Sequence, residues 1–377
     1  LTATTGSASG YGAWNLNGNV TSSGSSTIST SDAVNGTVML KVSGTTDFDV
    51  TSGTLTTSAP FIDNMNDSNT GALSKSGTGT MVLSGTNTYT GATTITAGTL
   101  TFSGSGSSNT SSGITVNGSD AKLVQASSVA MTPTVTLTQG TVTGSGTINT
   151  VNAGDNTGGI VSNNNGVAGA PLTIGSLNFN GAATVNTFSN STSAAIVTTS
   201  LSSNAAGMVT INPTAAVWAA GTYDLISYGG GSIGGAGFSK FQLGSVSGIS
   251  PRQSRVLGNS GTAITFTVGA DDTPYWVGDG DGKWNLASTN NWKLSSNNNY
   301  TTFLAFDNAI FNDSATGAGP VIVDIDTAPV NVTTANFQHS AKDYVLSGAF
   351  GIAAGSLTKS GTGTLTITNA NSYTGNT

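Results

Sequence analysis

The sequence predicts an all-β protein built as a parallel β-solenoid, and three observations lead to this fold class. Charged residues make up 7% of the 377 residues, against about 25% in typical globular domains. All 17 acidic residues are Asp, so Glu, a strong helix former, is missing. Short segments of alternating apolar residues are separated by Gly and Asn turns about every 8–12 residues, a spacing typical of sandwiches, barrels and solenoids.

Local connections favour the solenoid over the sandwich, because a sandwich of this length needs long crossings between its sheets. In a solenoid each coil lays its strands on the previous coil, about 4.8 Å away. Val, Ile, Leu and Met fill the inward positions, whereas Thr, Ser and Asn face outward and Gly and Asn form the corners. Uncharged strand edges of this kind are prone to pair with other edges.

A long internal repeat organises the chain. Residues 73–91 read LSKSGTGTMVLSGTNTYTG and residues 357–375 read LTKSGTGTLTITNANSYTG, an offset of 284 residues (357 minus 73). Each copy predicts a turn, a short strand of period 2 and a second turn that carries an aromatic residue. The first copy continues as TTITAGTLTFSGSG, which predicts two strands joined at Ala97-Gly98. We expect structural roles for the repeat residues Lys75, Gly77, Gly79, Asn87, Tyr89, Gly91, Lys359, Gly361, Gly363, Asn371, Tyr373 and Gly375.

The motif KSGTGT, followed by N-x-YTG and TTITAGTL, resembles the autotransporter-associated β-strand repeat, also called the passenger-associated transport repeat. The resemblance covers residues 73–101 and 357–377. It implies a right-handed β-helix and a location outside the cell or on a bacterial cell surface. Residues 221–229 and 276–348 look like companions of this repeat in very large secreted bacterial proteins.

Composition and the repeats divide the chain into five segments. A Gly-rich segment holds both Arg residues, and aromatic residues become more frequent after a plausible linker at 271–274. The expected segments are N-terminal solenoid coils (1–72), regular solenoid with the repeat motif (73–200), a Gly-rich irregular β segment (201–270), a Trp-rich β segment (271–348) and the second, truncated repeat copy (349–377).

Charge and hydropathy exclude several classes of partner. The net charge is −7, and ten basic residues spread singly along the chain cannot form a surface that follows nucleic-acid phosphates. No apolar run reaches the ~18–20 residues of a membrane helix, so we expect no direct membrane insertion. The absence of Cys excludes disulfides and thiolate chemistry.

The sequence does not predict an enzyme. Its single histidine, His339, has no nucleophile motif beside it, and we expect it to lie in a solvated turn. The pairs Asp47/Asp49 and Asp324/Asp326 place two carboxylates on one face of a strand, which could serve as acid and base on a polysaccharide. A polar strand edge explains Asp324 and Asp326 equally, so a polysaccharide-acting enzyme stays an alternative.

Two further candidate sites lie in the Trp-rich segment. Asp279 and Asp281 stand in a Gly-rich loop and could offer oxygen ligands to Ca²⁺, but no third ligand is evident and two Asp-Gly turns are the preferred interpretation. We therefore expect no cofactor. Trp276, Trp284 and Trp292 are spaced by eight residues. Exposed in a row they could stack on sugar rings, whereas packed together they would form a small core, which we favour.

Three functions remain, of which we favour a structural one: an extracellular stalk, fibre or filament. The alternatives are a carbohydrate- or surface-binding adhesin and a polysaccharide-acting enzyme. No charged cap is visible at either end, Thr377 stops where the first copy runs on into TITAGTLTF, and residues 1–4 read like a following strand. The expected partner is therefore the protein itself, as a head-to-tail homopolymer or a longer parent chain, with surface glycans as a further option.

Overall fold

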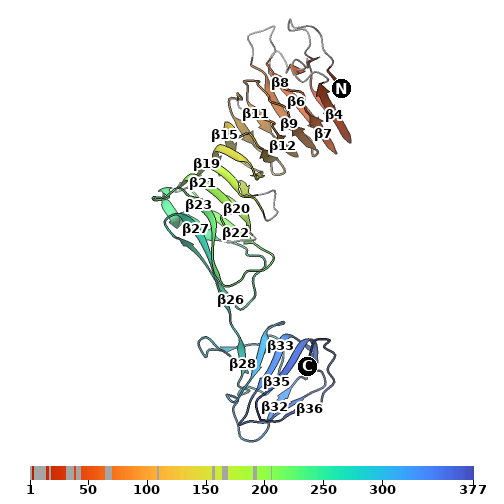
Figure 1. Ribbon diagram of the computed structural model, residues 1–377, viewed down its shortest axis with the longest axis vertical. Helices are drawn as coiled ribbons and strands as arrows, with labels where there is room; N and C mark the ends of the chain where they lie inside the picture. The colour runs from red at the N-terminus through yellow and green to blue at the C-terminus, as the bar shows by residue number, and fades with distance from the viewer. Residues whose placement is uncertain are drawn as a thin grey trace. The chain divides into compact units, whose positions relative to one another are not determined.

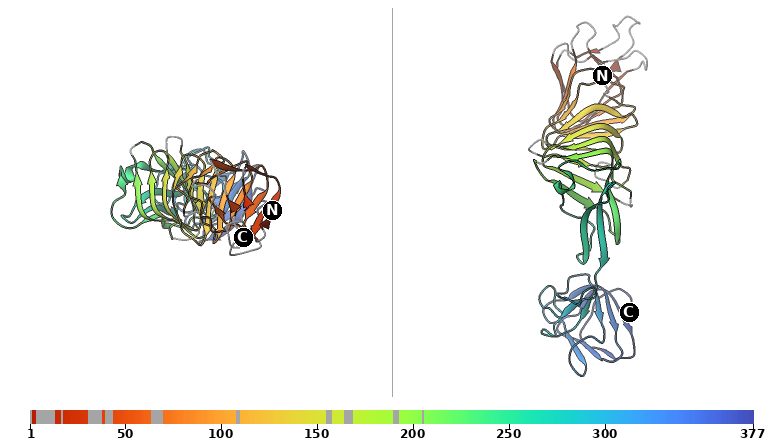
Figure 2. Two further views of the ribbon diagram at one scale, coloured as in Figure 1. Left: turned by 90° about the horizontal axis from the view of Figure 1, so that it is seen from above. Right: turned by 90° about the vertical axis from the view of Figure 1, so that its left-hand side faces the viewer.

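The computed structural model describes residues 2–3, 14–16, 18–30, 38–39, 44–63, 70–107, 110–154, 158–163, 169–189, 193–204 and 206–377. The chain divides into two compact units, which we call the first solenoid (residues 1–249 and 255–268) and the second solenoid (residues 250–254 and 269–377). Both consist of short strands stacked in ladders (Figures 1 and 2). The described residues contain no α-helix, only the 3₁₀ turn η2 (Gly237–Lys240), and hence no helix long and apolar enough to cross a membrane.

One wall of the first solenoid is a sheet of parallel strands, each from a successive coil. Its order is β1 (Thr2–Ala3), β4 (Ser25–Thr30), β7 (Thr54–Thr57), β10 (Thr80–Leu83), β12 (Thr99–Gly104), β14 (Lys122–Ser127), β16 (Thr141–Gly144), β18 (Ile160–Ser162), β20 (Ala183–Phe188), β22 (Val209–Thr214) and β25 (Phe241–Leu243).

The second wall is a sheet whose strands follow the coils in the same order along the solenoid, and it ends in an antiparallel ribbon. Its order is β3 (Val20–Ser22), β6 (Thr45–Val50), β9 (Ala72–Ser76), β11 (Thr93–Ile95), β13 (Ile114–Val116), β15 (Met131–Leu137), β17 (Thr147–Ala153), β19 (Leu172–Phe179), β21 (Ile196–Ser203), β23 (Gly221–Tyr228), β27 (Ala263–Asp271) and β26 (Gln253–Asn259), and β24 (Gly234–Gly235) also pairs with β21. A short third sheet joins β2 (Trp14–Asn15), β5 (Val38–Met39) and β8 (Phe61–Ile62).

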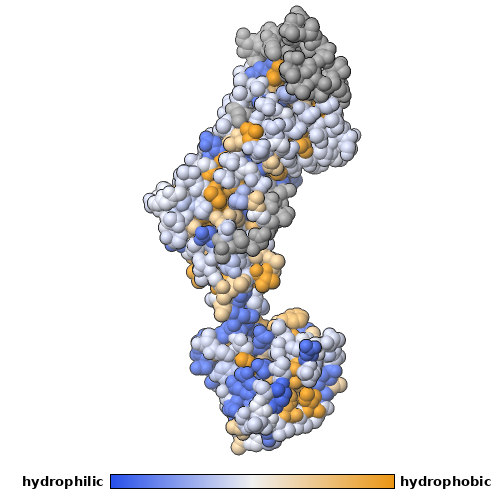
Figure 3. Space-filling view, viewed as in Figure 1, coloured by the Kyte–Doolittle hydropathy of each residue, from blue (hydrophilic) through white to orange (hydrophobic). Residues whose placement is uncertain are grey.

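Residue alternation explains why these segments form stacked strands. In β10, Met81 and Leu83 point inward and are fully buried, whereas Thr80 and Val82 are partly exposed. Register aligns Met81 with Leu55 on one side and with Leu100 on the other. Each coil therefore adds apolar side chains to one continuous core, while β-branched hydroxyl residues cover the outside. The visible face of this solenoid is accordingly pale, near neutral hydropathy, over most of its described area (Figure 3).

The last coils of the first solenoid are closed by a change of strand direction. β23 pairs in parallel with β21 but antiparallel with β27. Trp218 fills the end of the core and packs edge-on against Tyr223 and Phe266, with ring centroids 4.7 and 4.9 Å away. This ribbon covers the sheet edge that a parallel ladder would otherwise leave open.

The second solenoid repeats the architecture on a smaller scale and begins with antiparallel strands. Its larger sheet has the order β30 (Tyr300–Thr301), β29 (Trp292–Leu294), β28 (Pro274–Trp276), β31 (Asn308–Phe311), β33 (Val330–Gln338) and β35 (Ile352–Ser360). The other sheet joins β32 (Val321–Asp324), β34 (Tyr344–Ser347) and β36 (Leu365–Ile367). The pairs from β28 to β35 are parallel, whereas β29 pairs antiparallel with both β28 and β30.

These ladders confirm the predicted all-β parallel solenoid with a less regular aromatic-rich segment. The right hand of the coil, which the family resemblance implies, stays a prediction. Each solenoid has its own buried apolar cluster, and the second cluster is the more aromatic of the two.

Candidate functional site

The repeat lysine of the first copy is fully buried between two coils. The Lys75 ammonium donates to the carbonyl oxygens of Ser76 and Gly77 in its own turn, and to that of Ala97 in the next coil at 3.2 Å. Burial lowers the pKa of Lys75 to about 8, against the raising effect of Asp49 and Asp47. Carbonyl oxygens thus take the place of water around the cation, and one of them ties two coils together.

The repeat asparagine links three successive coils. Asn87 Oδ1 accepts a hydrogen bond from the backbone N–H of Phe61 at 2.9 Å, and its Nδ2 donates to the carbonyl oxygens of Gly85 and Ser107. Phe61 belongs to the preceding coil and Ser107 to the following one. A buried amide can take this position because all of these groups are paired.

The repeat tyrosine and the glycine after it complete the second turn. Tyr89 is fully buried, and its hydroxyl shares a hydrogen bond of 2.6 Å with Thr93 Oγ1. Gly91 donates to the Gly71 carbonyl oxygen at 2.9 Å, and a Cβ at Gly91 would lie 2.4 Å from that oxygen. The turn therefore fits only a residue without a side chain.

The first turn of the motif excludes side chains for the same reason. Gly77 has φ +67°, and a Cβ there would lie 2.4 Å from the Val50 carbonyl oxygen. At Gly79 a Cβ would lie 2.7 Å from a methyl group of Val50. Both glycines allow the coil to approach the backbone of the coil before it.

The second copy reproduces this network. Lys359 Nζ donates to the carbonyl oxygens of Ser360 and Gly361, and Asn371 Oδ1 accepts from Ile352 N–H at 2.8 Å. Tyr373 and Thr377 share a hydroxyl hydrogen bond of 2.9 Å. The motif's glycines match as well: Gly361 has φ +75°, Gly363 donates to His339 O, and Gly375 donates to Gly355 O.

The three indoles form the packed core that the sequence favoured, and they do not form an exposed sugar-stacking row. Trp276, Trp284 and Trp292 are at most 1% exposed and pack against one another and against Phe303 and Phe311. The indole centroids of Trp276 and Trp292 lie 5.0 Å apart. The even spacing places the three residues in one small aromatic core at the start of the second solenoid.

The Asp279–Asp281 loop is held by its own hydrogen bonds. Asp281 accepts from Asn291 Nδ2, from Lys283 N–H and from Thr289 Oγ1, and Asp279 accepts from the Tyr300 hydroxyl. Desolvation raises the pKa of Asp281, but these hydrogen bonds outweigh it and hold that pKa below its usual value. Within the described ranges, no group of three or more His, Asp or Glu residues could hold a metal ion.

Asn291, which sequence patterns did not reveal, is the centre of this loop. It is fully buried, and its Oδ1 accepts from the N–H groups of Gly280 and Asp281 while its Nδ2 donates to Asp281. The loop carboxylates therefore act as acceptors for protein donors.

His339 corrects an expectation from the sequence. It is 1% exposed, so it does not lie in a solvated turn. Its Nδ1–H donates to the Lys342 carbonyl oxygen at 2.6 Å, and its ring lies 4.7 Å from that of Tyr344. The histidine is a packed residue of the second core.

The remaining acidic pairs serve separate contacts. Asp47 accepts a hydrogen bond from the Ser76 hydroxyl at 2.7 Å, on the outer face beside the Lys75 turn. Asp326 forms an ion pair with Lys283, which lowers the pKa of Asp326 through the hydrogen bond. Asp324 joins this region through its backbone, which accepts from Trp284 N–H.

The most deeply buried ion pair of the second solenoid has no signature in the sequence. Arg252 Nε and Nη2 donate to the two carboxylate oxygens of Asp307 at 3.0 and 2.7 Å, and Nη1 donates to Thr301. The partners are 55 residues apart in sequence, so no local pattern joins them. This bidentate pair fixes residues 250–254 to the second solenoid.

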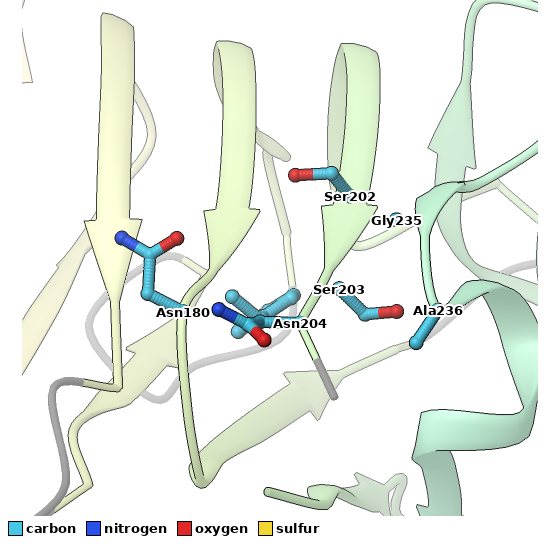
Figure 4. Close-up of a pocket in the computed structure, with 7 residues that line it drawn as sticks. Asn180, Ser202, Ser203, Asn204, Gly235 and Ala236 are labelled. Atoms are coloured by element: carbon cyan, nitrogen blue, oxygen red, sulfur yellow. The ribbon is translucent and has the colours of Figure 1, made fainter. Parts of the chain in front are cut away.

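One surface depression of the first solenoid is lined by uncharged residues, with the polar side chains of two Asn and two Ser beside the apolar Phe179 and Ala236. Asn180 and Asn204 lie at the ends of neighbouring strands, and Ser203 turns toward Ala236 (Figure 4). The side chain of Ser202 donates to Asn178, and that of Ser203 donates to Gly237 O. The lining offers amide and hydroxyl groups and no formal charge.

Comparison with known families agrees with the stacked coils. Residues 73–102 and 357–377 match the family model described as passenger-associated-transport-repeat, which confirms the resemblance. Searches of curated proteins and of solved structures returned no match. The chain is a β-solenoid in which two segments are similar to a repeat named for transported passengers.

Proposed function

We propose that the chain is a structural protein of the bacterial surface or extracellular space, a stalk or filament segment whose work is done by stacked coils. The proposal is carried by the hydrogen bonds that the polar side chains of the repeat make. Lys75 and Asn87 donate to carbonyl oxygens of neighbouring coils, so the residues that could carry chemistry are bound to the backbone ladder. The match to a passenger-associated repeat supports secretion to the surface.

Few basic residues and dense ladders suit a protein that persists outside a cell. Lys and Arg number ten in 377 residues, and two of them, Lys75 and Arg252, are engaged in buried contacts. Trypsin-like proteases should therefore find few accessible sites. The proposed partner is a further copy of the same solenoid, joined head to tail or within a longer chain. Residues 1–4 are expected to form the strand that makes this head-to-tail contact. Of these, residues 1 and 4 lie outside the described residues.

Electron microscopy and proteolysis test the structural function. Negative-stain images of the purified chain should show narrow rods or filaments, and native trypsin digestion should leave the solenoids intact for hours. Compact particles together with rapid digestion would contradict the proposal. Turnover of a polysaccharide at an ordinary enzymatic rate would replace it with the enzyme alternative.

An adhesin is the second candidate. Its glycan-binding site would be the depression at Asn180 and Asn204, because the indoles are buried. Neutral amide and hydroxyl groups can pair with sugar hydroxyls without the desolvation cost of charge. Binding to a glycan array that is lost in Asn204→Ala and kept in Trp284→Phe would support this candidate. Binding that is unchanged by Asn204→Ala would remove the depression from consideration.

A further inference from the structure

The strands that bury two of the tryptophans carry a second set of side chains on their outer face. Trp276 and Trp292 point inward from β28 and β29, so the residues beside them, Tyr275 and Lys293, point outward and are partly exposed. β30 adds Tyr300, which is 52% exposed. This part of the second solenoid therefore has an aromatic face toward solvent in addition to its aromatic core.

Strand register places these outer residues side by side. Tyr275 pairs with Lys293 across β28 and β29, and Lys293 pairs with Tyr300 across β29 and β30. Ile310, which is partly exposed on β31, extends the row on the other side of Tyr275. Because neighbouring strands lie about 4.8 Å apart, the four side chains form one continuous row. We call Tyr275, Lys293, Tyr300 and Ile310 the tyrosine strip.

Both tyrosine rings of the strip are fixed through their hydroxyl groups. The Tyr275 hydroxyl donates to Asn298 Oδ1 at 3.0 Å, and the Tyr300 hydroxyl donates to the Asp279 carboxylate. Asn298 in turn helps to close the connection between β29 and β30, because its N–H donates to the Leu294 carbonyl oxygen at 2.9 Å. The rings are thus held in place before a ligand arrives, so binding on them costs little side-chain entropy.

Lys293 gives the strip a positive charge without a carboxylate partner. Its ammonium lies 4.4 Å from the centroid of the Tyr300 ring, a cation–π contact. Lys293 belongs to none of the ion pairs that the described residues form, and Asp279, which holds the Tyr300 hydroxyl, is not within ion-pair distance of it. The three N–H donors of the ammonium can therefore turn toward an anion that comes from outside.

We infer that the tyrosine strip binds an acidic sugar, that is, a pyranose ring that carries a carboxylate. The ring faces of Tyr275 and Tyr300 receive the apolar C–H face of the sugar, and the Lys293 ammonium donates a charge-assisted hydrogen bond to its carboxylate. The net charge of −7 does not prevent this contact, because repulsion from distant carboxylates is screened over about 8 Å at physiological ionic strength. This binding goes beyond the proposed structural function and does not depend on it.

A matched pair of ligands tests the role of the carboxylate. Oligogalacturonate and its methyl ester have the same sugar rings and differ in charge, and each is titrated calorimetrically into the full chain. We expect oligogalacturonate to bind at least about tenfold more tightly than its ester, and this advantage should shrink as the salt concentration rises. An oligo-aspartate of the same charge should bind no better than the ester, because it offers carboxylates without a sugar face.

Three protein variants locate the contact. Lys293→Met should weaken oligogalacturonate about tenfold, to the affinity of the ester, and should leave the ester unchanged. Tyr300→Leu should weaken both ligands, because it removes a ring face that each of them uses. Lys359→Met removes an exposed lysine from β35 of the same sheet and should change neither affinity. Should Tyr300→Leu fail to fold, the ligand pair and Lys293→Met still test the strip.

Three outcomes would overturn the inference: equal or absent binding of the two sugars, an unchanged affinity for oligogalacturonate in Lys293→Met, or binding of oligo-aspartate as tight as that of oligogalacturonate. The last outcome would assign the strip to an acidic peptide. Asn204→Ala should leave this binding unchanged, because the depression that it alters lies in the first solenoid. Rods in micrographs and resistance to trypsin would still stand in each case, so failure here is distinct from failure of the structural proposal.

Discussion

At the scale of single residues, the solenoid places a cation where most cores tolerate none. Lys75 is buried between coils, its hydrogen-bond partners are backbone carbonyl oxygens of two coils, and the carboxylates of Asp47 and Asp49 lie on the outer face nearby. An ammonium can offer three donors in different directions, which suits a turn that presents three acceptors. A guanidinium, with its planar fork, would not match this arrangement. The motif thus uses charge locally as a tie between coils.

The lowered pKa of Lys75 predicts a pH dependence of the first solenoid. Folded Lys75 has a pKa of about 8, against 10.5 in the unfolded chain, so between these values the unfolded state binds more protons. The free energy of unfolding should therefore rise from pH 8 to 10.5 in the wild type. The Lys75→Met variant should lack this rise. Hydrogen exchange of residues 93–102 measures the stability of this region at each pH, and the value for the variant is subtracted from the value for the wild type.

Lys359→Met is the matched control for this pH dependence, because Lys359 occupies the same motif position but is exposed. Its removal should leave the exchange of residues 93–102 unchanged at every pH. A wild-type curve that is flat from pH 8 to 10.5 after subtraction would contradict the prediction.

Two glycine substitutions distinguish the stability cost of a left-handed backbone conformation from the cost of crowding between coils. Gly98 and Gly104 have φ +61° and +58°, but a Cβ meets carbonyl oxygens at 2.4 Å only at Gly98, and nothing lies within 4 Å at Gly104. Gly104→Ala should cost about 1–2 kcal/mol for the left-handed conformation alone. Gly98→Ala should cost about 1–3 kcal/mol more because the coils must separate. Equal losses in denaturant unfolding would show that crowding does not matter.

At the scale of elements, the sequence predicted what is periodic and missed what interrupts the period. The alternation of Thr80 to Leu83, and the motif turns, follow directly from side-chain period and from glycine at positive φ. The antiparallel direction of β27 has no such signature, because a strand's alternation is the same in either direction. The spacing of the tryptophans by eight residues predicted that they lie together, but the extent of their burial depends on the surrounding fold. The Arg252–Asp307 pair also depends on the fold.

The antiparallel ribbon predicts a capping role for β27. Phe266 is fully buried against Trp218, so Phe266→Ala should leave a cavity that costs about 3–5 kcal/mol and loosens β27 from β23. Hydrogen exchange of residues 221–228 should accelerate, and the freed edge should promote association visible by size-exclusion chromatography. The neighbouring Thr267→Ser, which keeps the hydroxyl that shares a hydrogen bond with Thr222 on β23, should change neither measurement.

At the scale of the whole molecule, two separate apolar clusters predict two unfolding transitions. One cluster contains Phe102 and the other contains Trp284, and no residue belongs to both. Calorimetry of the full chain should therefore resolve two cooperative units. Trp284→Ala should lower the midpoint of one transition, with a loss of about 3–5 kcal/mol, and Phe102→Ala should lower the other by a similar amount. A single transition that shifts with either variant would show that the two solenoids unfold as one cooperative body. Ile322→Ala, at a position that is 62% exposed, should shift neither transition.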